Sequence, residues 1–347
     1  ICFIAGFLMT AMPRMSGSAP ASWAETCGLM SLILGILISL NLSNWLMANL
    51  FFIAAFVWLL LFGVRRMKAC HSQAKVKPPV EFVWVPIALF HGVLGSILLM
   101  AGTSKFTGAW TILTGKSMVQ QGVVLAIVLG VGGFLAPRLM GTFRIVKPAA
   151  GPCCEIKQEK NRGRWMLLHL TAGALLLLSF FFEGFGFLRI AYGVRAFVVT
   201  LLMIWTRSLV FKPLMNEQYV RLIWLSLWLV AAGSWAAFVL LPYRAAMLHF
   251  IFIGGYSLMT FAVATMVITS HAGRSEQLKC RSKIISFLAF ALVSATCLRV
   301  ASAFFPSRYF QFLGLSSFLW LAAAFLWLVR MAPLIFTFPG AEDIASM

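Results

Sequence analysis

His249 and His271 bracket one long apolar segment, and imidazole is the side chain best suited to bind a metal or a haem iron near neutral pH. The segment has no charged residue between the two histidines and ends in the tetrapeptide 271–274, His-Ala-Gly-Arg. As a straight α-helix it would separate the two imidazoles by roughly 33 Å, close to the thickness of a bilayer core. The two histidines therefore cannot share one metal ion.

Other ionisable residues are expected deep inside apolar segments. His91 lies midway along the segment 81–102, about 15 Å from either face of a bilayer, and Arg195 lies near the middle of 185–205. A charged or titratable side chain at such a depth is costly and marks a candidate functional position. We expect His91 to be a ligand or a packed structural residue, and Arg195 to pair with a carboxylate, a haem propionate or helix carbonyls. His169, one turn inside its helix, is a weaker candidate ligand. The structural alternative for every histidine is a helix cap, a bond across the bundle or a place among lipid headgroups.

The elements that must position these residues are transmembrane helices. Of the 347 residues, 61% are hydrophobic and 11% are charged, with a mean hydropathy of +0.94, whereas roughly 25% of the residues of a soluble domain are charged. We predict an all-α polytopic bundle that forms a single domain over 1–347. The opening run 1–9 is interpreted as the second half of a helix, which would give about twelve spans in the full protein. The ten complete spans are expected at 24–41, 44–64, 81–102, 118–136, 165–183, 185–205, 221–241, 247–270, 284–303 and 309–330.

Basic residues alternate between the loops. The chain has 28 Lys and Arg against 9 Asp and Glu, and the loops at 65–79, 137–164 and 271–283 hold sixteen of the basic residues. This alternation predicts that these loops and the C-terminus are cytoplasmic, with 137–164 a basic cytoplasmic loop. Because the charge lies in short loops beside apolar spans, we expect a lipid bilayer as partner and no nucleic acid.

Motifs of soluble enzymes are absent from the sequence. It has no GxSxG, P-loop, Rossmann or HExxH motif and no adjacent histidines. Its seven cysteines have no spacing typical of a disulfide framework or a zinc site. One remaining hypothesis is a haem-free transporter or permease in which His91, Arg195 and Glu183 form a polar pathway.

Three segments together resemble the NnrS family of haem- and copper-containing inner-membrane proteins linked to nitric-oxide metabolism. The stretch 4–13, IAGFLMTAMP, is similar to the family's IAGFLLTAVP. The helix from His249 to Arg274 is similar to its signature of His, Gly, Met-Thr and a terminal GHTGR, with Ser270 and Ala272 as replacements. The run 132–137, GGFLAP, resembles its GGRVIP.

The chain also departs from the family pattern. Phe134 stands where the family usually has Arg, and the helix 221–241 has Ser226 and no His where the family commonly carries one. The family's paired histidines before IAGFL would lie upstream of the given sequence, near the expected depth of His249.

The resemblance implies a bacterial inner-membrane protein of nitric-oxide metabolism or nitrosative-stress protection. It implies haem, with copper as a second cofactor, and nitric oxide or a metal–nitrosyl product as the small-molecule partner. We expect His249 to be the first metal ligand and His91 the second. Arg195 is expected to be a charge partner of the cofactor. His271 with Arg274 is expected to form a cytoplasmic helix-end motif, and both are counted among the cofactor-binding residues. A scaffold that kept the fold and lost its cofactor is the third hypothesis. Catalytic turnover, the haem type, the electron donor and the oligomeric state are left open.

Overall fold

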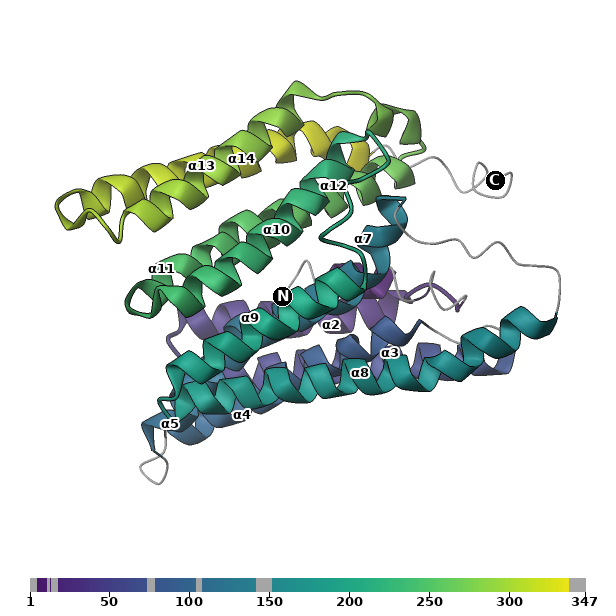
Figure 1. Cartoon of the computed structure of the whole chain (residues 1–347), viewed down its shortest axis with the longest axis horizontal. Helices are drawn as coiled ribbons and strands as arrows, with labels where there is room; N and C mark the ends of the chain where they lie inside the picture. Colours follow the sequence, from purple (N-terminus) through teal and green to yellow (C-terminus); the bar gives the residue numbers. More distant parts are fainter. Residues whose placement is uncertain are drawn as a thin grey trace. The chain divides into compact units, whose positions relative to one another are not determined.

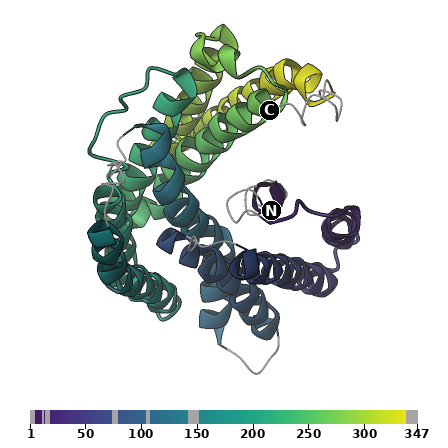
Figure 2. The ribbon, with the colours of Figure 1, turned by 90° about the vertical axis from the view of Figure 1, so that its right-hand side faces the viewer.

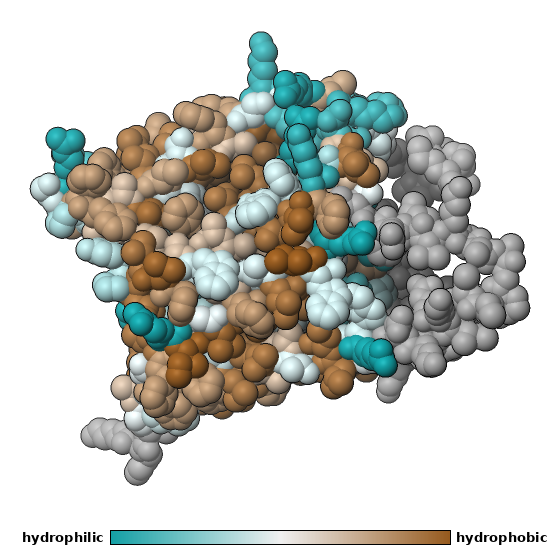
Figure 3. All heavy atoms as spheres, in the orientation of Figure 1, coloured by the Kyte–Doolittle hydropathy of each residue, from teal (hydrophilic) through white to brown (hydrophobic). Residues whose placement is uncertain are grey.

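The computed structural model describes residues 5–10, 13, 18–73, 79–103, 108–141 and 152–336, without the side chains of 67–73 and 152–161. In these ranges every regular element is a helix, and ten helical segments are long and apolar enough to cross a membrane. Hydrophobic residues cover the lengths of the helices, and hydrophilic residues gather mainly where the helices end (Figure 3). The all-α transmembrane bundle predicted from the sequence is therefore confirmed, with a lipid bilayer as its environment.

Contacts within the chain define two compact units. Unit 1 comprises residues 1–134 and 146–194, and unit 2 comprises residues 135–145 and 195–347. Unit 1 contains α2 (Trp23–Asn41), α3 (Trp45–Gln73), η1 (Val80–Val83), α4 (Trp84–Gly102), α5 (Ala109–Ser117), η2 (Met118–Gly122), α6 (Val123–Ile127), η3 (Val128–Gly132), the start of α7 (Gly133–Leu139), α8 (Pro152–Gly184) and the start of α9 (Leu188–Trp205).

The pairing of α2 with α3 in unit 1 is fixed at one end by a capping box. The backbone N–H of Glu25 donates to the Ser22 hydroxyl at 3.2 Å, and the Ser22 N–H donates to the Glu25 carboxylate at 2.9 Å, which satisfies N–H groups that a helix start leaves free. The same carboxylate forms an ion pair with Arg66 near the far end of the α3 span. The Trp58 indole of α3 donates to the Glu25 carbonyl at 3.2 Å. The start of α2 is therefore held by both its own cap and its neighbour.

Glycines set the approach of α4 to the helical segment α5–α7. A Cβ added at Gly95 would lie 2.9 Å from Met118, and one at Gly102 would lie 2.3 Å from Ile112. The partner numbers fall as the α4 numbers rise, so the two segments are antiparallel neighbours. The segment α5–α7 contains two π-helical stretches, η2 and η3, each ending in a glycine. π-Helical turns are rare in α-helices and occur frequently at functional sites.

Unit 2 consists of a second group of long helices, of which α13 and α14 lie side by side in both views (Figures 1 and 2). The Trp320 indole of α14 donates to Ser257 at 3.2 Å and the Trp327 indole donates to Thr265 at 2.9 Å. The other face of α14 is apolar and exposed, with Phe318 66% accessible, as expected for a lipid-facing helix. The elements of unit 2 are α10 (Gln218–Val239), η4 (Leu241–Tyr243), α11 (Arg244–His249), η5 (Phe250–Ser257), α12 (Leu258–His271), η6 (Ser275–Lys279), α13 (Lys283–Ala301), η7 (Pro306–Arg308) and α14 (Tyr309–Phe336).

Two ranges differ from the sequence expectation. The span expected at 118–136 begins at Ala109, because the helix includes Lys116 instead of beginning after it. Within the expected loop 137–164, α7 continues to Leu139 and α8 begins at Pro152, while 142–151 lie outside the described residues. Of the expected half helix at 1–9, residues 5–9 are helical and 1–4 lie outside the described part.

Candidate functional site

His249 is the last residue of α11, directly before the π-helical segment η5 in unit 2. Its Nδ1 lies 2.9 Å from the Ala245 carbonyl and 3.3 Å from the Ala246 carbonyl. Since a carbonyl oxygen only accepts, Nδ1 must carry the proton and Nε2 keeps its lone pair. A histidine held in this way by a backbone carbonyl has the tautomer and orientation of a metal ligand. The side chain as a whole is half-buried.

Close packing surrounds the π-helical segment that follows His249. A Cβ added at Gly255 would lie 2.4 Å from Val230 of α10, and one at Gly254 would lie 3.3 Å from the Thr296 hydroxyl of α13. The two glycines therefore allow α10 and α13 to approach the segment. Ser226 of α10 faces this region, with its carbonyl 3.5 Å from the added Cβ of Gly255.

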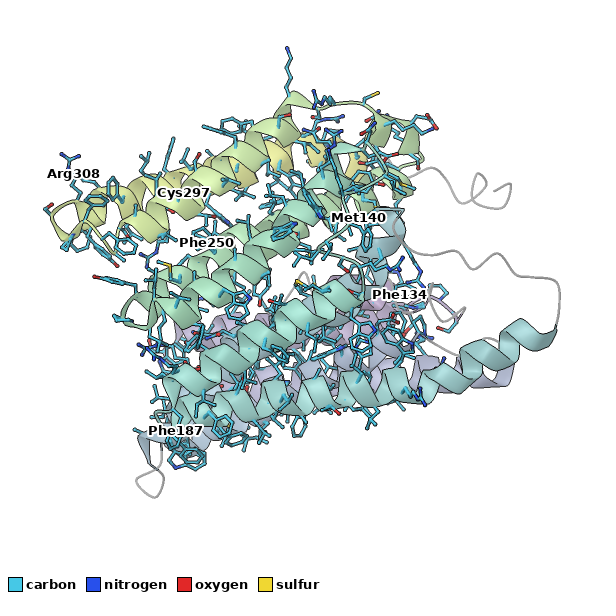
Figure 4. All side chains as sticks on the ribbon, in the orientation of Figure 1. Phe134, Met140, Phe187, Phe250, Cys297 and Arg308 are labelled. Carbon is cyan, nitrogen blue, oxygen red and sulfur yellow. The ribbon has the colours of Figure 1, made fainter. Side chains whose placement is uncertain are left out.

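Arg299, on the neighbouring helix α13, is a charged residue that acts on the His249 imidazole. It lies in the last turn of that helix. Its Nη1 donates to the Ser302 hydroxyl at 3.0 Å, and its guanidinium carbon lies 5.9 Å from the centre of the Tyr309 ring. Figure 4 labels Arg308 at the tip of this end of unit 2. The sequence analysis did not include Arg299 among the site residues.

Arg195 is 3% exposed and its charge acts on Tyr256, in the π-helical segment. The predicted buried arginine is therefore confirmed as buried. A role as charge partner of a cofactor stays a prediction.

His271 and Arg274 lie at the opposite end of α12 from η5 and form the end of that helix. Gly273 has φ +69°, its N–H donates to the Ser270 carbonyl at 3.2 Å, and the Arg274 N–H donates to the Thr269 carbonyl at 3.0 Å. These two bonds and the left-handed glycine make a Schellman motif. The His271 Nδ1 donates to the Val267 carbonyl at 2.7 Å. This tetrapeptide therefore ends the helix. That it also binds a cofactor stays a prediction.

His91 lies in unit 1, fully buried in the middle of α4. Its Nδ1 donates to the Ile87 carbonyl at 2.7 Å, so it has the same tautomer as His249. Its ring meets the Phe180 ring edge-on, with the centres 5.5 Å apart. A Cβ added at Gly122, the last residue of η2, would lie 2.8 Å from the His91 Cδ2. His91 is therefore held in a tightly packed position, which favours the structural alternative stated for it.

His169, also in unit 1, has the opposite tautomer. The Trp84 indole, which can only donate, lies 2.8 Å from the His169 Nδ1, so Nδ1 is the acceptor and the neutral ring carries its proton on Nε2. Neither nitrogen then offers a free lone pair. This bond makes His169 a structural residue and argues against the weaker ligand hypothesis.

The polar pathway hypothesis gains no geometric support within the units. Glu183 of α8 accepts a hydrogen bond from the Tyr192 hydroxyl at 2.9 Å, and His91 is packed as described. Among the described side chains, no group of three or more His, Cys, Asp or Glu is arranged to hold a metal ion.

Two residues with a place in these sites were not predicted from the sequence. Trp84 fixes the tautomer of His169. This role can be recognised only once α4 and α8 are known to be neighbours. One feature of the sequence could have indicated Arg299. Between Gln218 and Ala341 the sequence has one acidic residue, Glu276, so Arg299 is far in sequence from any residue of opposite charge.

The comparisons with known proteins identify the family. A family model described as NnrS protein matches residues 1–337. No curated protein and no solved structure matches the chain. Because the match covers nearly the whole sequence, the chain belongs to the NnrS family.

Proposed function

We propose that this NnrS-family member is a haem protein of the bacterial cytoplasmic membrane that acts in nitric-oxide metabolism or nitrosative-stress protection, with His249 as its iron ligand. The observation that carries the proposal is the tautomer of His249: the Ala245 carbonyl at 2.9 Å holds the proton on Nδ1, which leaves Nε2 as a donor atom to a metal. The side chain as a whole is half-buried.

A haem iron fits this donor set and a copper ion does not. Haem is held by as few as one axial imidazole from the protein, which His249 supplies. A copper site needs several ligands that converge, and the described side chains hold no such group. We therefore assign no copper ligand to the described residues.

The chain's own residues would orient the cofactor and keep water away. The Ala245 carbonyl fixes the plane of the His249 imidazole, and the buried side chains of Met247, Leu248 and Ile251 flank it in sequence. A bound haem supplies an iron that takes nitric oxide as a ligand. Nitric oxide is small and uncharged, so it could reach such a site from the bilayer.

The orientation in the membrane follows from the charge pattern. We propose that the loops at 65–79, 137–164 and 271–283 and the C-terminus are cytoplasmic. His249 then lies near the outer face and His271 near the inner face, so nitric oxide would meet the cofactor at the outer side.

The test is the haem content and Soret spectrum of the full-length protein with His249→Ala. We expect haem per protein to fall, or the Soret band to shift, because an axial imidazole is removed. His271→Ala is the matched control: the same residue type, with the same Nδ1 bond to a helix carbonyl, at the other end of one span. It should leave the spectrum nearly intact.

A variant with a smaller side chain separates ligation from folding. His249→Gly leaves space for free imidazole, and added imidazole should restore the band. Equal haem loss in the His249 and His271 variants at matched expression, or a protein that contains no haem at all, would contradict the proposal. Unchanged spectra in both variants would indicate that His91, and not His249, is the iron ligand.

A further inference from the structure

The end of unit 2 that holds η4 and η7 has an unbalanced positive charge. Three arginines lie there, Arg244, Arg299 and Arg308. The unit offers no acidic side chain to them among its described residues: its carboxylates are Glu217, directly before α10, and Glu276, which is paired with Lys279 at 2.9 Å. Both carboxylates lie at the other ends of these helices, away from the three arginines.

Two arginines of this end, Arg299 and Arg244, are half-buried, whereas Arg308 is exposed. Arg244 donates to the Leu241 carbonyl at 3.3 Å, and Arg299 is the one whose charge acts on His249. The contacts of Arg299 are with neutral groups, the Ser302 hydroxyl at 3.0 Å and the Tyr309 ring at 5.9 Å, and its charge acts on the neutral tautomer of His249. A cation that is partly removed from water is stabilised by a paired anion. By contrast, the comparably placed Arg66 of unit 1 is paired with Glu25.

The shape of the site indicates which anion it would take. A guanidinium presents a planar fork of N–H donors that matches a carboxylate or another planar oxyanion with two parallel hydrogen bonds. One nitrogen of this fork donates to the Ser302 hydroxyl at 3.0 Å, and the Tyr309 ring centre lies 5.9 Å from the guanidinium carbon. We infer that Arg299, beside His249, is an oxyanion-binding residue that receives either a carboxylate of the porphyrin bound by His249 or a small oxyanion from the aqueous phase.

Binding of a porphyrin carboxylate rests on the proposed function, whereas binding of a small oxyanion from the aqueous phase does not. If His249 holds a haem, Arg299 on the neighbouring helix α13 would be the residue that receives one of the porphyrin carboxylates. A small oxyanion would need only the guanidinium and an approach from the end of the unit.

The experiment compares Arg299→Gln with Arg308→Gln, a matched control of the same residue type at the same end of unit 2. The haem-free protein, in a non-ionic detergent without added lipid, is titrated with sodium acetate against sodium chloride at equal ionic strength, and the unfolding midpoint is followed. Acetate should raise the midpoint of the wild type and of Arg308→Gln. In Arg299→Gln the apparent affinity should fall by about tenfold to a hundredfold, because bonds to a charged group are lost.

The second arm measures the rate at which the haem-loaded protein transfers haem to excess apomyoglobin. Arg299→Gln should increase this rate by about tenfold or more if the porphyrin carboxylate is the ligand, and Arg308→Gln should stay within about twofold of the wild type. Arg299→Lys keeps the charge without the fork, preserves the fold if Gln does not, and should give intermediate values.

Each combination of results either supports or overturns the inference. An effect on haem transfer identifies the porphyrin carboxylate, and an effect on acetate alone identifies a free oxyanion. If the protein holds no haem, the proposed function fails while the acetate arm still tests Arg299. Acetate that does not distinguish Arg299→Gln from the wild type, together with unchanged haem transfer, would overturn the inference.

Discussion

Replacing Gly122 by alanine tests whether His91 is a packed residue. The added Cβ would lie 2.8 Å from the His91 Cδ2 and 3.0 Å from the Phe180 Cε2. The imidazole would have to move by about 0.6 Å to reach an ordinary contact of 3.4 Å, and both rings are fully buried. Overpacking of this kind costs about 1–3 kcal/mol, and the better helix propensity of alanine offsets about 1 kcal/mol. We expect a net loss of stability of up to about 2 kcal/mol.

The assay is thermal unfolding of the purified full-length protein, with Gly132→Ala as the matched control. Gly132 ends the second π-helical stretch as Gly122 ends the first, but its added Cβ would meet nothing closer than Val128 at 3.8 Å. The Gly122 variant should unfold roughly 2–6 °C below the wild type, and the Gly132 variant at or slightly above it. Equal midpoints for the two variants would refute the packing argument.

A double-mutant cycle identifies the group that opposes the new methyl. In a His91→Ala background, Gly122→Ala should cost nothing further, because the ring it meets is gone. If the cost persists there, Phe180 is the opposing group. The same variants report on function: an unchanged Soret band in Gly122→Ala agrees with a structural His91, whereas a shifted band would indicate that His91 is a ligand.

Three further outcomes are expected. Trp84→Phe should lower stability by about 1–3 kcal/mol, because the buried His169 Nδ1 loses its donor, and an unfolding midpoint equal to that of the wild type would show that the bond is dispensable. Gly273→Ala should cost about 1–2 kcal/mol by the same assay, since a side chain is strained at φ +69°; no loss would contradict the Schellman assignment. With the exposed Cys280 as sole cysteine, a membrane-impermeant maleimide should label inside-out vesicles only, and labelling of intact cells would reverse the proposed topology.

The fold could be predicted from the sequence wherever apolar length alone decides it. Ten apolar runs became ten candidate spans because a bilayer requires that length and the backbone has no alternative to a helix. The prediction was wrong at the start of the fourth complete span, where Lys116 suggested a loop and the helix begins at Ala109. A lysine near the end of a span extends toward water along its own stem, so its position in the sequence does not locate the end of the helix.

The π-helical segments could not be predicted. The segment 247–270 was expected to be one regular helix, but Phe250–Ser257 is π-helical. Periodicity is averaged over a window longer than such a segment, and the close approach that Gly254 and Gly255 permit depends on which helices lie opposite. The 33 Å expected between His249 and His271 therefore assumed a regular α-helical rise that this span does not keep throughout.

For the candidate site too, the sequence could predict how deep a residue lies but not which groups surround it. The sequence indicated that His91 is deep and that His249 lies at the end of an apolar segment, because position along a helix gives depth. It could not show that the His91 ring packs against Phe180, or that Trp84 fixes the tautomer of His169. Those facts depend on α4 and α8 being neighbours, a contact between residues far apart in the chain.

The surroundings of Nε2 distinguish the two candidate ligands, since their tautomers are the same. Both His91 and His249 donate from Nδ1 to a helix carbonyl. The first ring is buried among packed groups, whereas the second is half-buried beside Arg299. Two positions where the resembled family has a polar residue are occupied here by groups that need no cofactor: Phe134 packs against Phe82 at 5.3 Å, and the Ser226 hydroxyl donates to the carbonyl of its own helix at 2.6 Å. Under the proposed function, the His249 imidazole would hold the cofactor in unit 2, and the roles of Arg195 and Arg299 toward it stay predictions.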